Sequence, residues 1–201
     1  MIGPEKFSDA GIFRVRDDLS LVLTVDFFPP VVDDPEMYGA IAAANALSDC
    51  YAMGEAAGGP VRRRVPERAS QETVTAIFRG GFGKVKEAGA VVAGGHTVRH
   101  SEPMFGFAVT GEVHPNDMIT NERARPGDLL YLTKPLGCGS ITTGIKKDKT
   151  RPEWARAAME SMAALNAGRP PRRSRRGRTR RPTSPASDCW DTRRTWRALR
   201  G

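Results

Sequence analysis

Residues 24–54, TVDFFPPVVDDPEMYGAIAAANALSDCYAMG, contain a change from strand to helix that decides the fold class. The β-rich run ends before two prolines, and Asp34 and Pro35 then form an N-cap followed by a proline at the first helical position. The Ala-rich periodic sequence that follows predicts a helix that ends at Gly54. This stretch therefore predicts a strand followed by a long, mostly apolar helix.

Further elements are predicted on both sides of this stretch. Residues 11–28 read as two strands around a polar turn at 16–18, which is a hairpin with Asp26 at the end of its second strand. A helix is predicted over 71–89, although three glycines weaken it, and a buried strand over 90–93 runs into a glycine turn. The remaining predicted elements are a strand over 104–113, a turn, a strand and the start of a helix over 125–147, and a helix over 152–166. The mixed order predicts an α+β fold with a domain boundary between 114 and 127.

The charge of the chain is concentrated at its C-terminal end. The net charge of +8 by itself suggests a polyanion partner, but residues 167–201 hold twelve Arg and two acids, and the rest has nineteen basic and twenty-one acidic residues. The tail contains Leu199 alone among Leu, Ile, Val and Phe, so it is expected to be disordered. It also lacks Lys, and two Trp are its only aromatic residues, whereas polyanion-binding tails usually mix Lys with Arg and interleave aromatics, so no nucleic-acid partner is expected.

The cellular location is predicted from what the sequence lacks. It contains neither a signal peptide nor an apolar run long enough to cross a membrane. Cys50, Cys138 and Cys189 have no disulfide or metal-ligand spacing. These features predict a cytoplasmic protein with no membrane partner.

Three acids stand at the ends of predicted elements, namely Asp9, Asp26 and Asp49. Asn45 and Asp49 are four residues apart and so share one face of the predicted helix. Carboxylates that converge from separate elements suit Mg²⁺, which commonly bridges a few carboxylates and nucleotide phosphates. For any one of these acids alone, a capping or surface role is the simpler interpretation.

Two glycine turns offer weaker signals. The GGHT stretch at 94–97 follows an apolar run, and its backbone N–H groups can approach a phosphate because two of its residues have no side chain. His96 could contact a nucleotide or merely satisfy the turn. The GCGSITTGIK stretch at 137–146 resembles a phosphate-binding loop, but Lys146 comes one position too late for that motif.

Taken in order, these motifs resemble the selenophosphate synthetase (selenide, water dikinase) family, which belongs to the superfamily of aminoimidazole ribonucleotide (AIR) synthetase. The resemblance covers about residues 2–54 and 71–166 and is carried by SDAG, TVDFFPPVVDDP, IAAANALSDCYAMG, VVAGGHT, FGFAVTGEV and RPGDLLYLTKPLGCGSITTGIK. The related thiamine monophosphate kinases would show Gly-Gly-Asp where this chain has GGH. The resemblance implies an AIR synthase-like N-terminal domain over 1–113, the start of its α/β C-terminal domain over 114–166, and a homodimer.

The same resemblance implies a reaction and a set of ligands. ATP, selenide and water would give selenophosphate, AMP and phosphate, with Mg²⁺ as the cofactor. Asp9 and Asp49 would hold the metal, and Asp26 would lie nearer the nucleotide. The other residues implied in ATP binding are Lys6, Phe7, Ser8, Asp49, Gly95, His96 and Thr97. Phosphoryl transfer depends on positioning and charge neutralisation, which explains a site built of acids and glycines.

The chain departs from the family pattern at two places. It starts at Met1, downstream of the expected Gly-rich loop that bears a catalytic Cys or selenocysteine and a Lys, so no catalytic nucleophile is assigned. The later DVTGFGLLGH motif, whose Asp holds metal, is also absent. The expected consequence is little or no synthetase activity. An in-frame TGA codon upstream, read as a stop in place of selenocysteine, would explain the start at Met1.

The second departure has an explanation in the codons. A DNA sequence that encodes DVTGFGLLGH encodes TSPASDCWDT, residues 183–192, when its first base is dropped. The tail over 167–201 is therefore interpreted as family sequence translated out of frame. Residues 55–70 are interpreted as a second out-of-frame stretch, in which Arg62, Arg63 and Arg64 replace an expected buried strand. Two alternatives are a small nucleic-acid-binding protein and a noncatalytic nucleotide-binding fragment.

Overall fold

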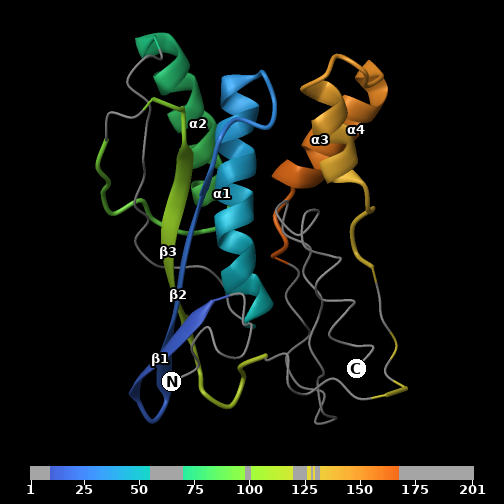
Figure 1. Ribbon diagram of the computed structural model, residues 1–201. Coiled ribbons are helices and arrows are strands. Elements are labelled where there is room, and N and C mark those ends of the chain that lie inside the picture. The colour runs from blue at the N-terminus through green and yellow to red at the C-terminus, as the bar shows by residue number, and fades with distance from the viewer. Residues whose placement is uncertain are drawn as a thin grey trace.

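A three-stranded sheet and four helices form the part of the chain that the computed structural model describes, which is residues 10–54, 70–97, 101–119, 126–127, 129 and 132–167 (Figure 1). Among these helices, α1 is the longest, and neither it nor any other combines the length and the apolar character needed to cross a bilayer. The mixture of helices and strands confirms the predicted α+β class. Residues 1–9, 55–69 and 168–201, where parts of the predicted site and both proposed frame slips fall, lie outside the described residues.

The sheet is antiparallel and has the order β1-β2-β3, with β1 at Gly11–Arg16, β2 at Leu19–Phe28 and β3 at Phe105–Val113. The predicted hairpin over 11–28 is confirmed by the pairing of β1 with β2. The strand β2 continues two residues beyond Asp26, so the prediction that this acid ends the strand is wrong. The reason is that β3 pairs with β2 as far as Phe28, and this pairing extends the ladder.

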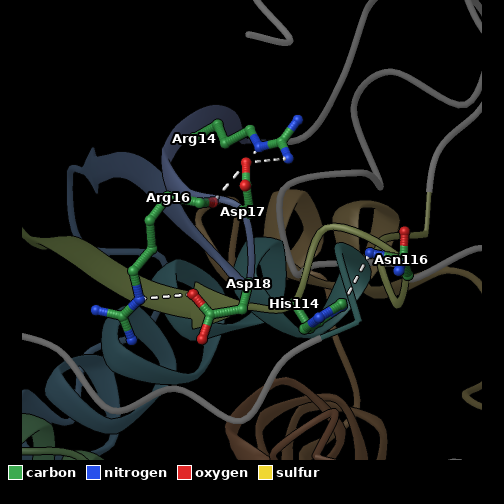
Figure 2. Close-up of polar contacts among 6 residues, drawn as sticks. All are labelled: Arg14, Arg16, Asp17, Asp18, His114 and Asn116. Carbon is green, nitrogen blue, oxygen red and sulfur yellow. Dashed lines mark hydrogen bonds and ion pairs between the residues drawn. The ribbon is translucent and has the colours of Figure 1, made fainter.

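Charged side chains surround the hairpin turn (Figure 2). Arg14 pairs with Asp17 at 2.9 Å, and Arg16 pairs with Asp18 at 2.6 Å. The hydrogen bond from Arg16 holds the pKa of Asp18 below its ordinary value. Because all four side chains are exposed, water screens these pairs, and they contribute little to stability. These four charged side chains are therefore a surface feature of the turn.

Two helices cover one face of the sheet. Helix α1 spans Pro35–Ala52, and the Asp34 side chain accepts hydrogen bonds from two backbone N–H groups of its first turn, as the sequence predicts. Tyr38 joins α1 to the end of β2, because its hydroxyl donates to the carbonyl of Phe28, and burial raises the pKa of this phenol. Helix α2 spans Gln71–Glu87 and packs along α1.

The second helix pair lies on the other side of α1 (Figure 1). Helix α3 spans Cys138–Ile145, and α4 spans Pro152–Ala163 and contacts α1. The predicted helix over 152–166 is confirmed but stops three residues early. Beyond its end, Lys134 donates to the carbonyl of Ala164, and Asn166 donates to the Ser48 hydroxyl on α1 at 2.9 Å. The Asn166 contact holds the chain after α4 against α1.

One prediction fails at residues 90–93, which were expected to form a buried strand. The structure shows a single bridging residue at Val91, and the Val91 side chain is 66% exposed. A strand requires a neighbour along its whole length, and the described sheet ends without one here. Ala90, by contrast, is 8% exposed and belongs to the core, and Val92 packs against it, so the segment is only partly buried. The predicted strand near 128–133 falls largely outside the described residues.

Glycines allow α1 and α2 to approach closely. A Cβ built on Gly80 of α2 would overlap the backbone carbonyl oxygen of Glu36, and one on Gly39 of α1 would overlap that of Ile77. This explains why α2 is a helix although glycine is an unfavourable residue in its interior. The free energy of packing against α1 exceeds the local cost.

We expect Gly80→Ala to lower the free energy of unfolding by about 2–3 kcal/mol, because the methyl group must push two helix backbones apart. Gly83→Ala, three residues later on the exposed face, meets nothing within 4 Å. It should raise stability by about 0.5–1 kcal/mol through helix propensity. Urea denaturation of both variants measures the difference. Equal effects at the two positions would contradict the close packing.

Candidate functional site

Two of the predicted acids meet where β2 faces α1. On this strand, Val22, Thr24 and Asp26 alternate with residues of the opposite face, so their side chains point toward the helix. The Thr24 hydroxyl donates to Oδ2 of Asp49 at 2.6 Å, and the Asn45 amide donates to Oδ2 of Asp26 at 2.9 Å. The structure therefore brings Asp26 and Asp49 to one interface.

The spacing of the two elements explains why both bonds form together. Thr24 and Asp26 are two residues apart, which is about 6.6 Å along a strand. Asn45 and Asp49 are one helical turn apart, which is about 6 Å along the helix. Since α1 runs opposite to β2 at this point, 24 faces 49 and 26 faces 45. The distance between the two strand residues therefore nearly equals the distance between the two helix residues.

Burial of these two carboxylates costs free energy. Asp49 is 8% exposed and Asn45 is 1% exposed, whereas Asp26 is half-buried. A buried carboxylate loses its hydration and is stable only with hydrogen bonds and compensating charge. Thr24 and Asn45 are neutral donors, so they orient the two carboxylates but leave their negative charge in place. Such a pair favours the approach of a cation.

Hard oxygen ligands from separate elements fit Mg²⁺. This ion keeps several waters and is commonly bound by one or two carboxylates together with substrate phosphates. Within the described part of the chain, no three or more His, Cys, Asp or Glu side chains form a cluster that could hold a metal. Asp26 and Asp49 therefore suit an ion that is shared with a phosphate-bearing ligand, and do not by themselves form a closed metal cage.

Of the other predicted site residues, three lie in the described part of the chain. Gly95, His96 and Thr97 lie in an exposed segment after α2, and a Cβ built on Gly94 would meet nothing within 4 Å. This open backbone is compatible with the approach of a phosphate. Lys6, Phe7, Ser8 and Asp9 lie outside the described residues, so their roles stay predictions.

Sequence reasoning missed Thr24 as part of the site. Its hydroxyl contacts Asp49, which is 25 residues away in the chain, and this contact has no local sequence signal. A period-2 pattern was available, because Thr24 and Asp26 are polar residues two apart in an apolar strand. Two polar side chains on the covered face of a strand indicate a polar partner on the helix.

Comparison with known proteins gives the family. The model of the AIR synthase related protein N-terminal domain matches residues 7–113, more than half of the chain. The chain belongs to this family. Its fold is also that of the solved structure described as AaThiL complexed with AMPPCP and TMP, with a TM-score of 0.65 and 18% identity over 79% of this chain and 53% of that one. The predicted AIR synthase-like fold is therefore confirmed.

The sequence relatives in this family are more specific. The chain is 48% identical over 166 residues to a selenide, water dikinase of Caldanaerobacter subterraneus subsp. tengcongensis, covering 83% of this chain and 48% of the relative. It is 47% identical over 167 residues to a selenide, water dikinase of Myxococcus xanthus, covering 83% and 47%. The chain thus spans about half the length of the curated relatives it matches. The resemblance noted in the sequence is confirmed as similarity to this branch of the family.

Proposed function

We propose that this chain comes from a selenide, water dikinase, which converts ATP, selenide and water to selenophosphate, AMP and phosphate. The observation that carries the proposal is the 48% identity over 166 residues to a protein of that name. The paired acids Asp26 and Asp49 support it, because phosphoryl transfer depends on neutralising and positioning phosphate charge.

Each residue of the site has a proposed role. Asp9 and Asp49 hold Mg²⁺, which supplies charge neutralisation on the phosphates when bound. Asp26 lies nearer the nucleotide. The exposed backbone of Gly95, His96 and Thr97 and the residues Lys6, Phe7 and Ser8 contact ATP. Thr24 keeps the Asp49 carboxylate in one orientation. We also propose that the N-terminal domain ends at 113 and that the start of the C-terminal domain ends at 166. The frame slips are proposed over 55–70 and 167–201.

We also propose a homodimer that forms through the face of the sheet opposite the helices. On this face, Phe13, Leu23, Val25 and Phe27 are between 43% and 64% exposed, although all are large and apolar. The pairing of β1 with β2 makes them one continuous surface. Exposed apolar patches of this kind mark interaction sites, and a second copy of the chain offers a surface of the same composition.

A cytoplasmic location fits the described cysteines. Cys50 and Cys138 are both buried, and the two are not joined to each other by a disulfide. Thiols persist in a reducing compartment, and selenide as a substrate would require the same condition.

The test of the proposed function has two stages. The 201-residue chain should bind the ATP analogue AMPPCP in the presence of Mg²⁺ and form little or no AMP from ATP and selenide. The protein encoded by a gene that is corrected at both frame slips and includes the Gly-rich loop should form AMP and phosphate from ATP only when selenide is present. Formation of ADP with thiamine monophosphate, as expected of the related thiamine monophosphate kinases, would contradict the proposal. Nucleotide binding without turnover by the corrected protein would favour the noncatalytic alternative.

A further inference from the structure

The turn between α3 and α4, at one end of this helix pair, carries a dense positive charge (Figure 1). Its cations are all exposed, and they are Lys146, Lys147, Lys149, Arg151 and, in the second turn of α4, Arg156. Two acids lie in the same stretch, so residues 146–156 have a net charge of +3, which is five cations less two acids. Because residues 1–166 as a whole are slightly acidic, this charge is a local feature of the turn.

The five cations of this turn lack ion-pair partners within the described part of the chain. Other exposed cations of the described surface do pair with acids, namely Arg14, Arg16 and Arg79. Like charges that lie close together repel one another and attract counter-ions. A polyanion that contacts several of them at once would therefore bind favourably.

Hydrogen bonds fix the backbone of the turn on α3. The backbone N–H groups of Lys147 and Lys149 donate to the carbonyl of Gly144 at 3.1 and 2.9 Å. The Thr150 hydroxyl donates to the carbonyl of Ile141 at 3.1 Å, and a Cβ on Gly144 would overlap this hydroxyl. The backbone that carries the charges is thus ordered in the absence of a partner, which lowers the entropy cost of binding.

Trp154 adds an aromatic surface to the charge. Its side chain is 50% exposed, and the guanidinium carbon of Arg151 lies 4.7 Å from the centroid of its ring. Aromatic rings beside cations are typical of single-strand binding sites, where bases stack on the rings and the cations contact phosphates. The expectation of no nucleic-acid partner rests on the tail, which has no Lys, and does not extend to this turn.

We propose that residues 146–156 form a docking surface for single-stranded nucleic acid, whose phosphates contact the cations and one of whose bases stacks on Trp154. Two other partners suit the surface less well. Protein interfaces are depleted in Lys, which supplies three of the five cations. A membrane surface requires a wider apolar face, and Trp154 is the one exposed large apolar residue in this stretch. The surface is separate from the site of Asp26 and Asp49, so its test does not depend on the proposed function.

The first test is photo-cross-linking of the 201-residue chain to a short oligouridine that carries 5-bromouracil, followed by mass spectrometry of the peptides. The main cross-link should fall on the peptide that contains Trp154. The tail holds twelve Arg together with Trp190 and Trp196, so it competes for the same probe in the same molecule. Cross-links confined to the tail would overturn the proposal.

Charge variants measure the phosphate contacts. Lys146→Ala, Lys147→Ala and Lys149→Ala combined should reduce the slope of log affinity against log salt concentration by about two, since each contact to a single strand contributes about 0.7. The matched control loses the same charge on the sheet and α2 by alanine substitution at Arg14, Arg16 and Arg79. It should keep the slope of the unchanged chain. Equal reductions in the two variants would show an effect of net charge alone and would overturn the proposed surface.

Trp154 variants measure the stacking. Trp154→Ala should raise the dissociation constant for oligouridine at least about fivefold, whereas Trp154→Phe keeps an aromatic ring and should recover most of the affinity. Neither variant should change the affinity for poly-glutamate, which has charge but no bases. An unchanged dissociation constant in Trp154→Ala would overturn the proposal. Binding of poly-glutamate or of phosphatidylserine vesicles as tight as that of oligouridine would also overturn it, in favour of an acidic protein or a membrane.

Discussion

Asp49→Asn should weaken binding of Mg²⁺ and AMPPCP by more than about a hundredfold, because it removes a carboxylate that is proposed to contact the metal, whereas outer-shell partners already cost 10- to 100-fold. Asparagine keeps nearly the same shape, and its carbonyl oxygen can still accept the hydrogen bond from Thr24. The packing between β2 and α1 should therefore persist. Equilibrium dialysis or calorimetry measures the loss.

The melting temperature of ligand-free Asp49→Asn should not fall, although its affinity for the ligand does. Asp49 is 8% exposed, and asparagine at this position would avoid the desolvation cost of a buried carboxylate while still accepting the hydrogen bond from Thr24. We expect the ligand-free Asp49→Asn chain to melt at the same temperature as the unchanged chain or higher, while the increase in melting temperature on adding Mg²⁺ and AMPPCP disappears. This combination separates a lost ligand from a lost fold.

Asp17→Asn is the matched control for charge. Asp17 lies in the exposed hairpin turn and pairs with Arg14, so the substitution removes the same charge at the surface (Figure 2). Its effect on both nucleotide binding and stability should be small. Unchanged nucleotide affinity in Asp49→Asn would show that Asp49 is not a ligand and would remove it from the site.

Val25→Lys should convert the proposed dimer to a monomer. Val25 is 64% exposed in the single chain and lies on the central strand of the apolar sheet face. A lysine there would be an unpaired charge in the middle of the interface, with a cost of about 3–5 kcal/mol, so the dissociation constant of the dimer should rise by at least about a hundredfold. Sedimentation velocity over a range of concentrations measures this change.

Val91→Lys is the control for this experiment. Val91 is 66% exposed, which is nearly the same fraction, but it lies outside the three strands of the sheet. This variant should remain a dimer. If the unchanged chain is a monomer at all concentrations, or if Val25→Lys dimerises as tightly as the unchanged chain, the sheet face is not the interface.

The elements with strong local signals could be predicted from the sequence. The hairpin over 11–28, the helix that begins after Asp34 and the helix that ends before Gly89 all formed within a few residues of their predicted limits. Each depends on interactions among residues close in the chain, such as the N-cap bonds of Asp34 and the positive φ of Gly89. Local chemistry suffices for such features.

The strand predicted at 90–93 shows where this reasoning fails. Its apolar residues match the composition of a buried strand, yet Val91 is 66% exposed and forms only a single bridge, and none of the three described strands extends along it. Helix α2 shows the opposite case. Its three glycines weaken the local prediction, but Gly80 is what permits close contact with α1. Burial and packing depend on what lies opposite, which periodicity does not reveal.

The sequence by itself determined the residue types of the candidate site and the face of α1 that carries them, since Asn45 and Asp49 are one helical turn apart. Only the tertiary structure decided that Thr24 bonds Asp49 and that Asn45 bonds Asp26. The physical reason is that these contacts join residues 19 and 25 positions apart. They depend on how far α1 slides and turns on the sheet, which the packing of the whole core sets.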